Sequence, residues 1–286
     1  MSDVSRDFSR KFIFENRPIR GHFVRLTETY QKILSQRAYP SNVAKFLGEA
    51  LVSTALINGL FKEPGKTLLQ FQGTGALQLL SVHGDLNHMR AVAQYSPELS
   101  KEGNFLEVLK AGTLALIHQP ETSVKSYQSV IEVISPEIAK NLEHYFWQSE
   151  QTQTRLWIAV TPVSVTGLLL QLLPDTEESQ EESWSHVLAL TNTVFEQELA
   201  QQTLETLVSH LYVGESIRLW DQREIHFHCP CNKARMENAL LLMGQAELEK
   251  ILNQEEALEV RCEFCGKTHS FDAVDVSGVF RGMTGS

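Results

Sequence analysis

The chain holds four cysteines, and all of them lie between positions 229 and 265. Cys229 and Cys231 flank Pro230, and 30 residues later Cys262 and Cys265 enclose a second pair of residues. Each cysteine pair presents two sulfurs from one short turn, and two such turns brought together form a tetrahedral four-thiolate site, the geometry that zinc prefers. The spacing therefore predicts one zinc ion per chain, bound by all four cysteines.

Three other interpretations of these cysteines are open at this point. The metal is purely structural, or the cysteines form two disulfides without a metal, which a reducing compartment disfavours. In the third, His226, His228 or His269 replaces one cysteine as a ligand. Four available thiolates make a histidine ligand unnecessary.

The Cys-x-Cys pair adds redox chemistry to the metal site. Cysteines separated by one residue can close a small disulfide ring, but the ring is strained and therefore easily reduced. Sulfurs bound to zinc are thiolates, which are the form that oxidants attack. Oxidation to disulfides removes the ligands of the metal, and a structural zinc site contributes on the order of 10 kcal/mol to folding. Oxidation is therefore expected to unfold the zinc module that contains the four cysteines.

Short strands and one broken helix are expected to carry the two cysteine turns. Strand-like residues 224–228 and 259–262 lead into the two pairs, and Gly266 completes the second turn. Between the pairs, residues 235–252 have helical character that is interrupted near Gly244.

A helical segment that needs outside support precedes the cysteines. Residues 186–212 have helical periodicity, and few ion pairs four residues apart support it. Most helical stability comes from packing an apolar face, so the stability of this segment depends on its neighbours. An acidic stretch, 175–182, precedes it and is expected to be a solvated linker. A zinc module beside such a segment is a plausible redox-controlled unfolding switch.

The first 174 residues predict an α+β fold, because runs of strands are mixed with a few helices. Helices are expected at 28–36 and 43–61, and Ser135 is expected to cap a helix whose first residue is Pro136. The predicted strands are 11–27 (as one or two strands), 67–72, 76–83, 89–95, 113–119, 127–134, 154–161 and 165–173.

Charge and hydropathy exclude several classes of protein. The net charge is −10, but residues up to Pro174 hold 17 Lys+Arg against 15 Asp+Glu, and the remainder holds 8 against 20. So acidic a C-terminal third disfavours nucleic-acid binding. No apolar run approaches the roughly 20 residues of a membrane span, and the best candidate, 47–61, contains Glu49. The first residues resemble no signal peptide, which predicts a cytoplasmic protein.

Motifs of common enzyme classes are missing from the sequence. It contains no Gly-x-Ser-x-Gly and no His-Glu-x-x-His, and Gly73-x-Gly75 is too short to be a phosphate-binding loop. The Cys262–Cys265 pair lacks the strand–helix context of a thiol oxidoreductase. We expect no enzymatic activity. The arginines near the N-terminus, namely Arg17, Arg20, Arg25 and Arg37, are interpreted as surface charge.

Together with these cysteines, motifs along nearly the whole chain carry a resemblance to a known family. The chain resembles the bacterial thirty-three-kilodalton heat-shock protein family, the redox-regulated holdase chaperones. Besides the four cysteines, the matching residues are Ile19-Arg20-Gly21 with Val24, Leu26 and Glu28-Thr29, the stretch Gly73–Ala93, Tyr145-Phe146, Ser149-Glu150-Gln151, Thr154-Arg155-Leu156, Gly167-Leu168-Leu169-Leu170-Gln171 and Leu173-Pro174.

The resemblance implies three parts: an N-terminal α+β domain of mixed sheet and helix (1–177), a helical, metastable linker (178–225) and a small C-terminal four-cysteine zinc-binding domain (226–286). The reduced, zinc-bound form is expected to be inactive. Oxidation is expected to form the disulfides Cys229–Cys231 and Cys262–Cys265, release zinc and loosen the linker. The oxidised form is expected to dimerise, hold unfolding client proteins without ATP, and pass them to ATP-dependent folding chaperones.

One apolar stripe of the linker is the candidate client-binding surface. In most proteins such a stripe is a core face. Here it is expected to be buried in the reduced form and to become client-binding surface after oxidation. Its residues are Val194, Phe195, Leu199, Leu204, Leu207 and Leu211. The alternative to a holdase is a zinc-ribbon adaptor with a purely structural metal.

Overall fold

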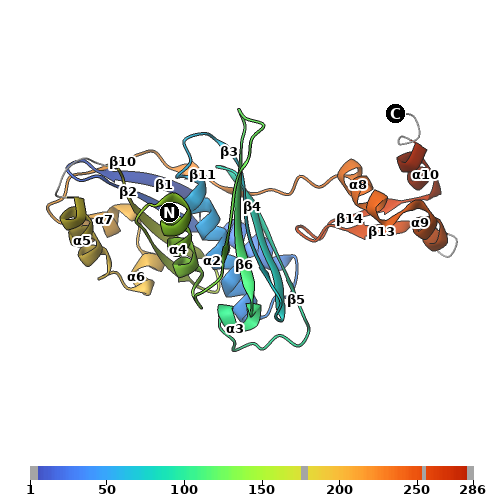
Figure 1. The fold of residues 1–286 in the computed structure, drawn as a ribbon, viewed down its shortest axis with the longest axis horizontal. Coiled ribbons are helices and arrows are strands. Elements are labelled where there is room, and N and C mark those ends of the chain that lie inside the picture. The colour runs from blue at the N-terminus through green and yellow to red at the C-terminus, as the bar shows by residue number, and fades with distance from the viewer. Residues whose placement is uncertain (1–5, 175–179, 253–255, 282–286) are drawn as a thin grey trace. The chain divides into compact units, whose positions relative to one another are not determined.

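A computed structural model describes residues 6–174, 180–252 and 256–281. The chain divides into two units, Met1–His228 and Cys229–Ser286 (Figure 1). The first unit combines two six-stranded sheets with helices, and the second combines helices with a two-stranded sheet. This mixture of strands and helices confirms the predicted α+β class. The predicted limits 1–177, 178–225 and 226–286 stay a prediction.

The first sheet joins the two ends of the N-terminal unit. Its strand order is β10-β1-β2-β9-β8, and β11 also pairs with β1. All of these pairs are antiparallel. Its strands are β1 (Phe8–Phe14), β2 (Ile19–Leu26), β8 (Thr154–Val160), β9 (Val165–Leu172), β10 (Ile217–Leu219) and β11 (Arg223–Glu224).

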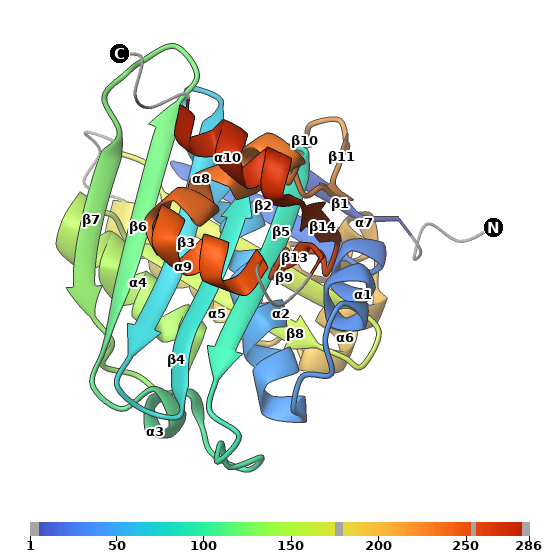
Figure 2. The same ribbon diagram turned by 90° about the vertical axis from the view of Figure 1, so that its right-hand side faces the viewer.

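The second sheet has the strand order β12-β5-β4-β3-β6-β7, and Figure 2 shows its longer strands side by side. Only β12 is parallel to its neighbour, β5, among these pairs. Its strands are β3 (Gly65–Gly73), β4 (Leu77–Gly84), β5 (His88–Tyr95), β6 (Gly112–Pro120), β7 (Tyr127–Glu132) and β12 (His226–Phe227).

Helix α2 (Ser41–Asn58) packs against strands of both sheets and forms the centre of the core (Figure 1). It is buried on nearly all sides, so the apolar run predicted at 47–61 belongs to a core helix. Among the described residues, no helix is both long enough and apolar enough to cross a membrane. Two shorter helices, α1 (Glu28–Ser35) and α3 (Phe105–Leu109), flank the sheets.

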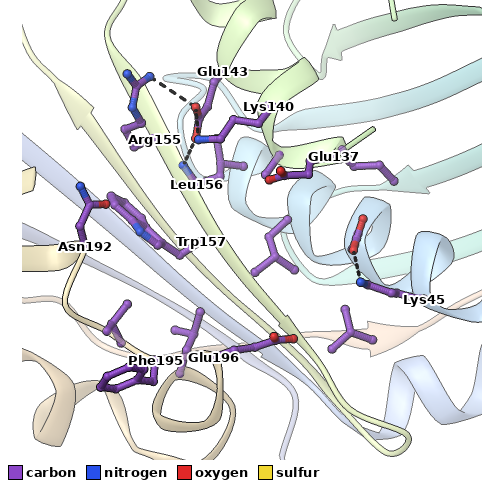
Figure 3. Close-up of a pocket in the computed structure, with 17 residues that line it drawn as sticks. Lys45, Glu137, Lys140, Glu143, Arg155, Leu156, Trp157, Asn192, Phe195 and Glu196 are labelled. Atoms are coloured by element: carbon purple, nitrogen blue, oxygen red, sulfur yellow. Dashed lines mark hydrogen bonds and ion pairs between the residues drawn. The ribbon is translucent and has the colours of Figure 1, made fainter. Parts of the chain in front are cut away.

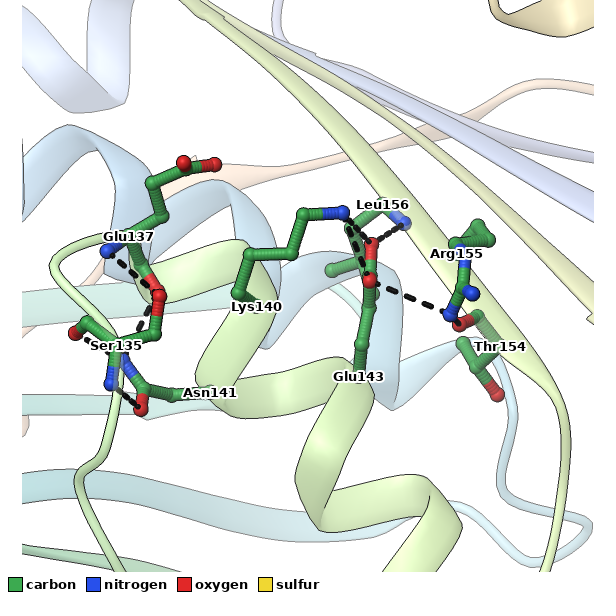
Figure 4. A network of polar contacts seen from close by, with 8 residues as sticks. All are labelled: Ser135, Glu137, Lys140, Asn141, Glu143, Thr154, Arg155 and Leu156. Carbon is green, nitrogen blue, oxygen red and sulfur yellow. Dashed lines mark hydrogen bonds and ion pairs between the residues drawn. The ribbon is translucent and has the colours of Figure 1, made fainter.

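Helix α4 (Ile138–Glu150) starts later than the sequence predicts. Its N-cap is Glu137 rather than Ser135. The buried side-chain amide of Asn141 accepts a hydrogen bond from the Ile134 N–H at 2.9 Å. It also accepts one from the Ser135 N–H at 2.9 Å and donates to the carbonyls of Ser135 and Glu137 (Figure 4). These bonds hold the preceding residues in a turn, which delays the helix.

A second polar group joins α4 to the first sheet. The buried carboxylate of Glu143 accepts hydrogen bonds from the Leu156 N–H at 3.0 Å and the Lys140 Nζ at 2.9 Å, and lies 3.4 Å from an Arg155 guanidinium nitrogen (Figure 4). A buried carboxylate needs such partners, because an unpaired charge in the interior is costly.

Three helices cover the other face of the first sheet: α5 (Gln180–Thr191), α6 (Glu196–Gln201) and α7 (Leu204–Leu211). The sequence predicts continuous helical character over 186–212, whereas the chain breaks twice. At the first break the Glu198 side chain accepts a hydrogen bond from the Phe195 N–H, and α6 starts after Phe195. At the second break the Thr203 side chain accepts a hydrogen bond from the Thr206 N–H, and α7 starts after Thr203. Of the predicted acidic linker, 175–179 lie outside the described residues and 180–182 begin α5.

The C-terminal unit contains α8 (Lys233–Met243), α9 (Gln245–Leu252), β13 (Leu258–Arg261), β14 (Thr268–Phe271) and α10 (Ala273–Arg281). The predicted helix break is confirmed at Gly244, whose φ of +85° favours glycine. The buried core of the described part is small and consists of Leu240, Leu248, Phe271 and Val276.

Candidate functional site

The four cysteine sulfurs converge in the C-terminal unit. All four Sγ atoms lie within 4.8 Å of one another, and no disulfide joins any of these four described cysteines. Two contacts join the two turns: Cys229 Sγ lies 3.7 Å from Cys262 Sγ, and Cys231 Sγ lies 3.3 Å from Cys265 Sγ. Within the described residues, none of the three candidate histidines belongs to this group.

Each sulfur pair is positioned by the start or end of a regular element. The first pair lies directly before α8, whose N-cap Asn232 accepts a hydrogen bond from the Arg235 N–H at 2.9 Å. The second pair lies in the turn between β13 and β14. There the Cys262 N–H donates to the Lys267 carbonyl at 2.9 Å, and Gly266, with a φ of +68°, donates to the Cys262 carbonyl at 2.8 Å. The glycine predicted at this turn is therefore required by its backbone conformation.

Thiolates at these distances need a cation beside them. Burial raises the pKa of Cys231, and its contacts with Cys265 and Cys229 raise it further. Burial also raises the pKa of Cys262. In a tetrahedral site with metal–sulfur bonds of about 2.3 Å, sulfurs lie about 3.8 Å apart. The observed separations, 3.3 and 3.7 Å between the turns and at most 4.8 Å within the group, lie around that value, so the four cysteines fit a tetrahedral metal ion.

The three helices preceding this unit bury an apolar surface on the first sheet. From the helices come Trp184, Val187, Leu199, Ala200, Leu204, Leu207 and Tyr212, and from the sheet come Phe8, Phe12, Phe14, Ile19, Phe23, Ala159, Leu168, Leu170 and Leu172. The sheet contributes one aromatic-rich face because alternate residues of a strand point the same way. This cluster supplies the support that the helical segment needs.

The predicted client-binding stripe is divided in the structure. Leu199, Leu204 and Leu207 are buried, and Val194 and Leu211 are partly buried against the same cluster. Phe195 differs, because it is the N-cap of α6 and its side chain is 73% exposed. The expectation that the whole stripe is covered is therefore corrected at this residue.

Two arginines interpreted as surface charge bind the helical segment instead. Arg25 is 1% exposed, and its guanidinium donates to the carbonyls of Leu199 at 3.2 Å and Gln202 at 2.6 Å, at the end of α6. A cation at a helix C-terminus satisfies carbonyls that have no partner within the helix. Arg17 makes a bidentate pair with Glu215, 2.8 Å for each bond. No spacing motif marks either arginine in the sequence.

A cavity of about 510 Å³ lies where this segment meets α2, α4 and β8 (Figure 3). Phe195 and Glu196 line one side, and Trp157 of β8 and Glu49 of α2 also line it. Burial raises the pKa of Glu49 to about 7, and the charges of Glu137 and Glu196 add to the effect, whereas Lys45, 3.8 Å away, opposes it. The charge of Glu49 therefore changes near neutral pH, at a site that lies beside the helical segment.

Comparisons with known proteins agree over nearly the whole chain. The family model described as Hsp33 protein matches residues 7–272. A 33 kDa chaperonin of Ectopseudomonas mendocina is 35% identical over 283 residues, covering 96% of each chain. A 33 kDa chaperonin of Shewanella loihica is 33% identical over 279 residues, covering 97% of each.

A solved structure shares the fold. The crystal structure of the 33 kDa chaperonin of Thermotoga maritima, a heat shock protein 33 homologue, superposes with a TM-score of 0.83. The match covers 98% of this chain and 99% of that one, at 19% sequence identity. At that identity the likeness establishes the common fold.

Proposed function

The chain belongs to the Hsp33 family, and from that premise we propose that it is a redox-regulated, ATP-independent holdase chaperone and not an enzyme. The observation that carries the proposal is the convergence of four cysteine thiols within 4.8 Å, in the unit that follows the helical segment and strands β10 to β12 in the sequence. That segment covers an apolar face of the first sheet, so oxidation of the thiols could expose this apolar surface by releasing the segment.

In the reduced state, one zinc ion per chain is held by Cys229, Cys231, Cys262 and Cys265. The chemistry of four soft thiolates supports zinc over hard cations, which take oxygen ligands. The helical segment lies on the sheet, held by the apolar cluster, Arg17 and Arg25. In this state the surface that binds clients is covered and the protein is inactive.

Oxidation forms the disulfides Cys229–Cys231 and Cys262–Cys265, each within one turn of the chain. Each pair of thiolates gives up two electrons to one hypochlorous acid as the S–S bond forms, and the chlorine and oxygen leave as chloride and hydroxide. Two such reactions consume all four thiolates and release the ion. Because small zinc domains derive much of their folding free energy from the metal, the C-terminal unit then unfolds.

Release of the helical segment then exposes the surface that binds unfolding proteins. We assign client contacts to Val194, Leu199, Leu204, Leu207 and Leu211, together with Phe195, which is already exposed. The oxidised form dimerises in the cytoplasm, and its clients pass to ATP-dependent folding chaperones when reductant returns. The net charge of −10 supports protein partners over nucleic acid or membrane surfaces.

The test measures zinc release and suppression of aggregation of a thermally unfolding client, before and after hypochlorite, without ATP. We expect zinc to leave, suppression to appear only then, and reductant with zinc to reverse both. Zinc release without any suppression would assign the metal a purely structural role and refute the redox switch.

Two variants make the cysteine assignment specific. Cys262→Ser is expected to lower the zinc content of the purified protein well below one per chain. His269→Ala is the control, because His269 is buried nearby on β14 but lies outside the sulfur group. Full zinc content in Cys262→Ser, or equal losses in both variants, would contradict the four-cysteine site.

A further inference from the structure

A second cavity, of about 570 Å³, lies beside the C-terminal end of α2 in the N-terminal unit. Strands β1 and β2, the residues after α2 and the stretch 220–223 line it. Its size is within the range of small-molecule sites. No residue of the sulfur group or of the apolar cluster's helices contributes to it.

Three cations and one histidine share a face of this sheet. Lys11 lies directly opposite His22, Arg20 pairs with Ile13, and Arg223 pairs with Ser9. Residues two apart on a strand point to the same face, and so do directly opposed residues on neighbouring strands. The register therefore brings all four side chains to one side, where each lines the cavity.

None of these cations forms an ion pair with a carboxylate among the described residues, although the charge of Glu150 acts on Arg20. Arg20 donates instead to neutral acceptors, the Gln171 side chain at 3.0 Å and the Leu60 carbonyl at 3.3 Å. Partial desolvation of its otherwise exposed side chain lowers the pKa of Lys11, and the charges of Arg223 and Arg20 lower it further. Mutual repulsion of this kind is relieved when an anion binds between the charges. Asp221, the one carboxylate that lines the cavity, is exposed to solvent.

His22 supplies an independent sign that a polar partner belongs here. Its Nδ1 lies 2.8 Å from the Leu56 carbonyl, so Nδ1 carries the proton and Nε2 is an acceptor. The ring is buried, and Nε2 has no hydrogen-bond partner. A side chain at Gly59 would clash with the ring, because its Cβ would lie 2.1 Å from His22 Cε1, so the ring is held in place. Buried acceptors of this kind are normally satisfied.

The remaining walls of the cavity are apolar. They are formed by Ile13, Leu60, Leu173 and Trp220. An inorganic anion would satisfy the cations but leave these walls in contact with water, whereas an apolar tail would bury them.

We propose that this cavity binds a small organic carboxylate with an apolar tail. The carboxylate lies among Lys11, Arg20 and Arg223, a water bound to it donates to His22 Nε2, and the tail packs against Leu60, Leu173 and Trp220. Ordered waters commonly bridge such groups at little cost in affinity. None of these residues belongs to the metal site, so binding in the reduced protein tests the inference separately from the proposed redox switch.

The experiment titrates decanoate, below its micelle concentration, into the reduced full-length protein by calorimetry. Decan-1-ol supplies the tail without the charge, and inorganic phosphate supplies the charge without the tail. We expect decanoate to bind at one site per chain and both reference compounds to bind at least about tenfold more weakly.

The matched variants are Lys11→Gln/Arg223→Gln and, as control, Lys66→Gln/Lys125→Gln, which removes two exposed charges outside the cavity. The first pair is expected to weaken decanoate binding at least about tenfold and the control less than about twofold. Lys11 and Arg223 are exposed, and circular dichroism checks that both variants fold.

Hydrogen exchange locates the bound probe, since decanoate is expected to protect amides of β10 and β11, which flank 220–223. Equal decanoate affinity in both double variants, equal affinity for decan-1-ol or phosphate, or protection elsewhere in the chain without protection here would overturn the proposal.

Discussion

The carboxyl group of Glu49 titrates far from the usual range of a glutamate. Because the group is buried, this shift should be measurable as a dependence of protein stability on pH. Burial raises its pKa to about 7 from an ordinary value of 4.5. The folded state therefore binds the proton more tightly than the unfolded state does. The stability that the protonated group contributes is fully present below about pH 4.5 and is lost as pH rises through about 7, on the order of 3 kcal/mol in total.

Glu49→Gln keeps the shape of the protonated side chain and removes the titration. We expect the variant to unfold at a higher temperature than the wild type at pH 8 and at nearly the same temperature at pH 4.5, measured by calorimetry of the zinc-bound protein. Glu121→Gln, at an exposed position, is the control and is expected to show no such difference. A stability gain for Glu49→Gln that is independent of pH would refute the buried-carboxyl explanation.

Single residues differ in how far the sequence reveals them. The four cysteines and Gly266 were predictable, because ligand spacing and a left-handed turn leave marks within a few positions of the chain. Arg25 and His22 were not, because their partners, the carbonyls at the end of α6 and the carbonyl of Leu56, come from segments distant in sequence. A charged residue in a strand looks the same in sequence whether it faces water or a helix end.

Among the elements, the helical segment can be tested by placing the same charge at a buried and at an exposed apolar residue. The comparison shows whether packing of the segment on the sheet, and not merely its apolar content, keeps the protein inactive. Leu207 is 3% exposed in α7, and Phe195 is 73% exposed before α6. Leu207→Glu places an unpaired carboxylate in the apolar cluster, at a cost of several kcal/mol, and should release the segment from the sheet. Phe195→Glu makes the same type of change where water already reaches the side chain.

We expect Leu207→Glu to suppress client aggregation in the reduced, zinc-bound state and to open 180–212 to limited proteolysis, while Phe195→Glu remains inactive until oxidised. The client assay and the proteolysis are run on the same preparations. If Leu207→Glu keeps the strict oxidant requirement of the wild type although its segment is cleaved, burial of the segment is not what keeps the protein inactive.

Most elements of the N-terminal unit could be predicted because they follow local periodicity, as β3 to β6 and α2 do. The helix breaks before α6 and α7 could not, because apolar residues continue at helical spacing through both of them. The short strand β10 was missed, since three residues form a strand only when an edge is available for pairing, whereas β12 lies within the predicted strand 224–228.

At the scale of the whole molecule, the two units differ in the size of the hydrophobic core that stabilises each of them. The N-terminal unit buries a large core around α2, whereas the described core of the C-terminal unit comprises four buried side chains. Domains of this size commonly need a metal or disulfides to remain folded. The order of the strands, with β9 between β2 and β8, depends on pairings between distant segments and could not be predicted from the sequence.

Removal of the metal should therefore unfold one unit and spare the other. We expect a chelator, added with reductant, to abolish amide protection in the described part of 229–281, while strands β1 to β9 of the two large sheets keep theirs in hydrogen exchange. Addition of zinc should restore the C-terminal unit. Loss of protection throughout both sheets at the same chelator concentration would contradict the independence of the two units.

The stretch that connects α7 to the first cysteine pair closes two sheets at once. Through β10 and β11 it pairs with β1, and through β12 with β5, so each sheet has an outermost strand supplied by the same few residues. If this stretch lifts away, β1 and β5 are left with rows of free N–H and C=O groups. Such rows accept any extended polypeptide by main-chain pairing, whatever its side chains. The release of strands β10 to β12 would therefore give a holdase a way to bind the backbone of a misfolding protein in addition to its apolar side chains.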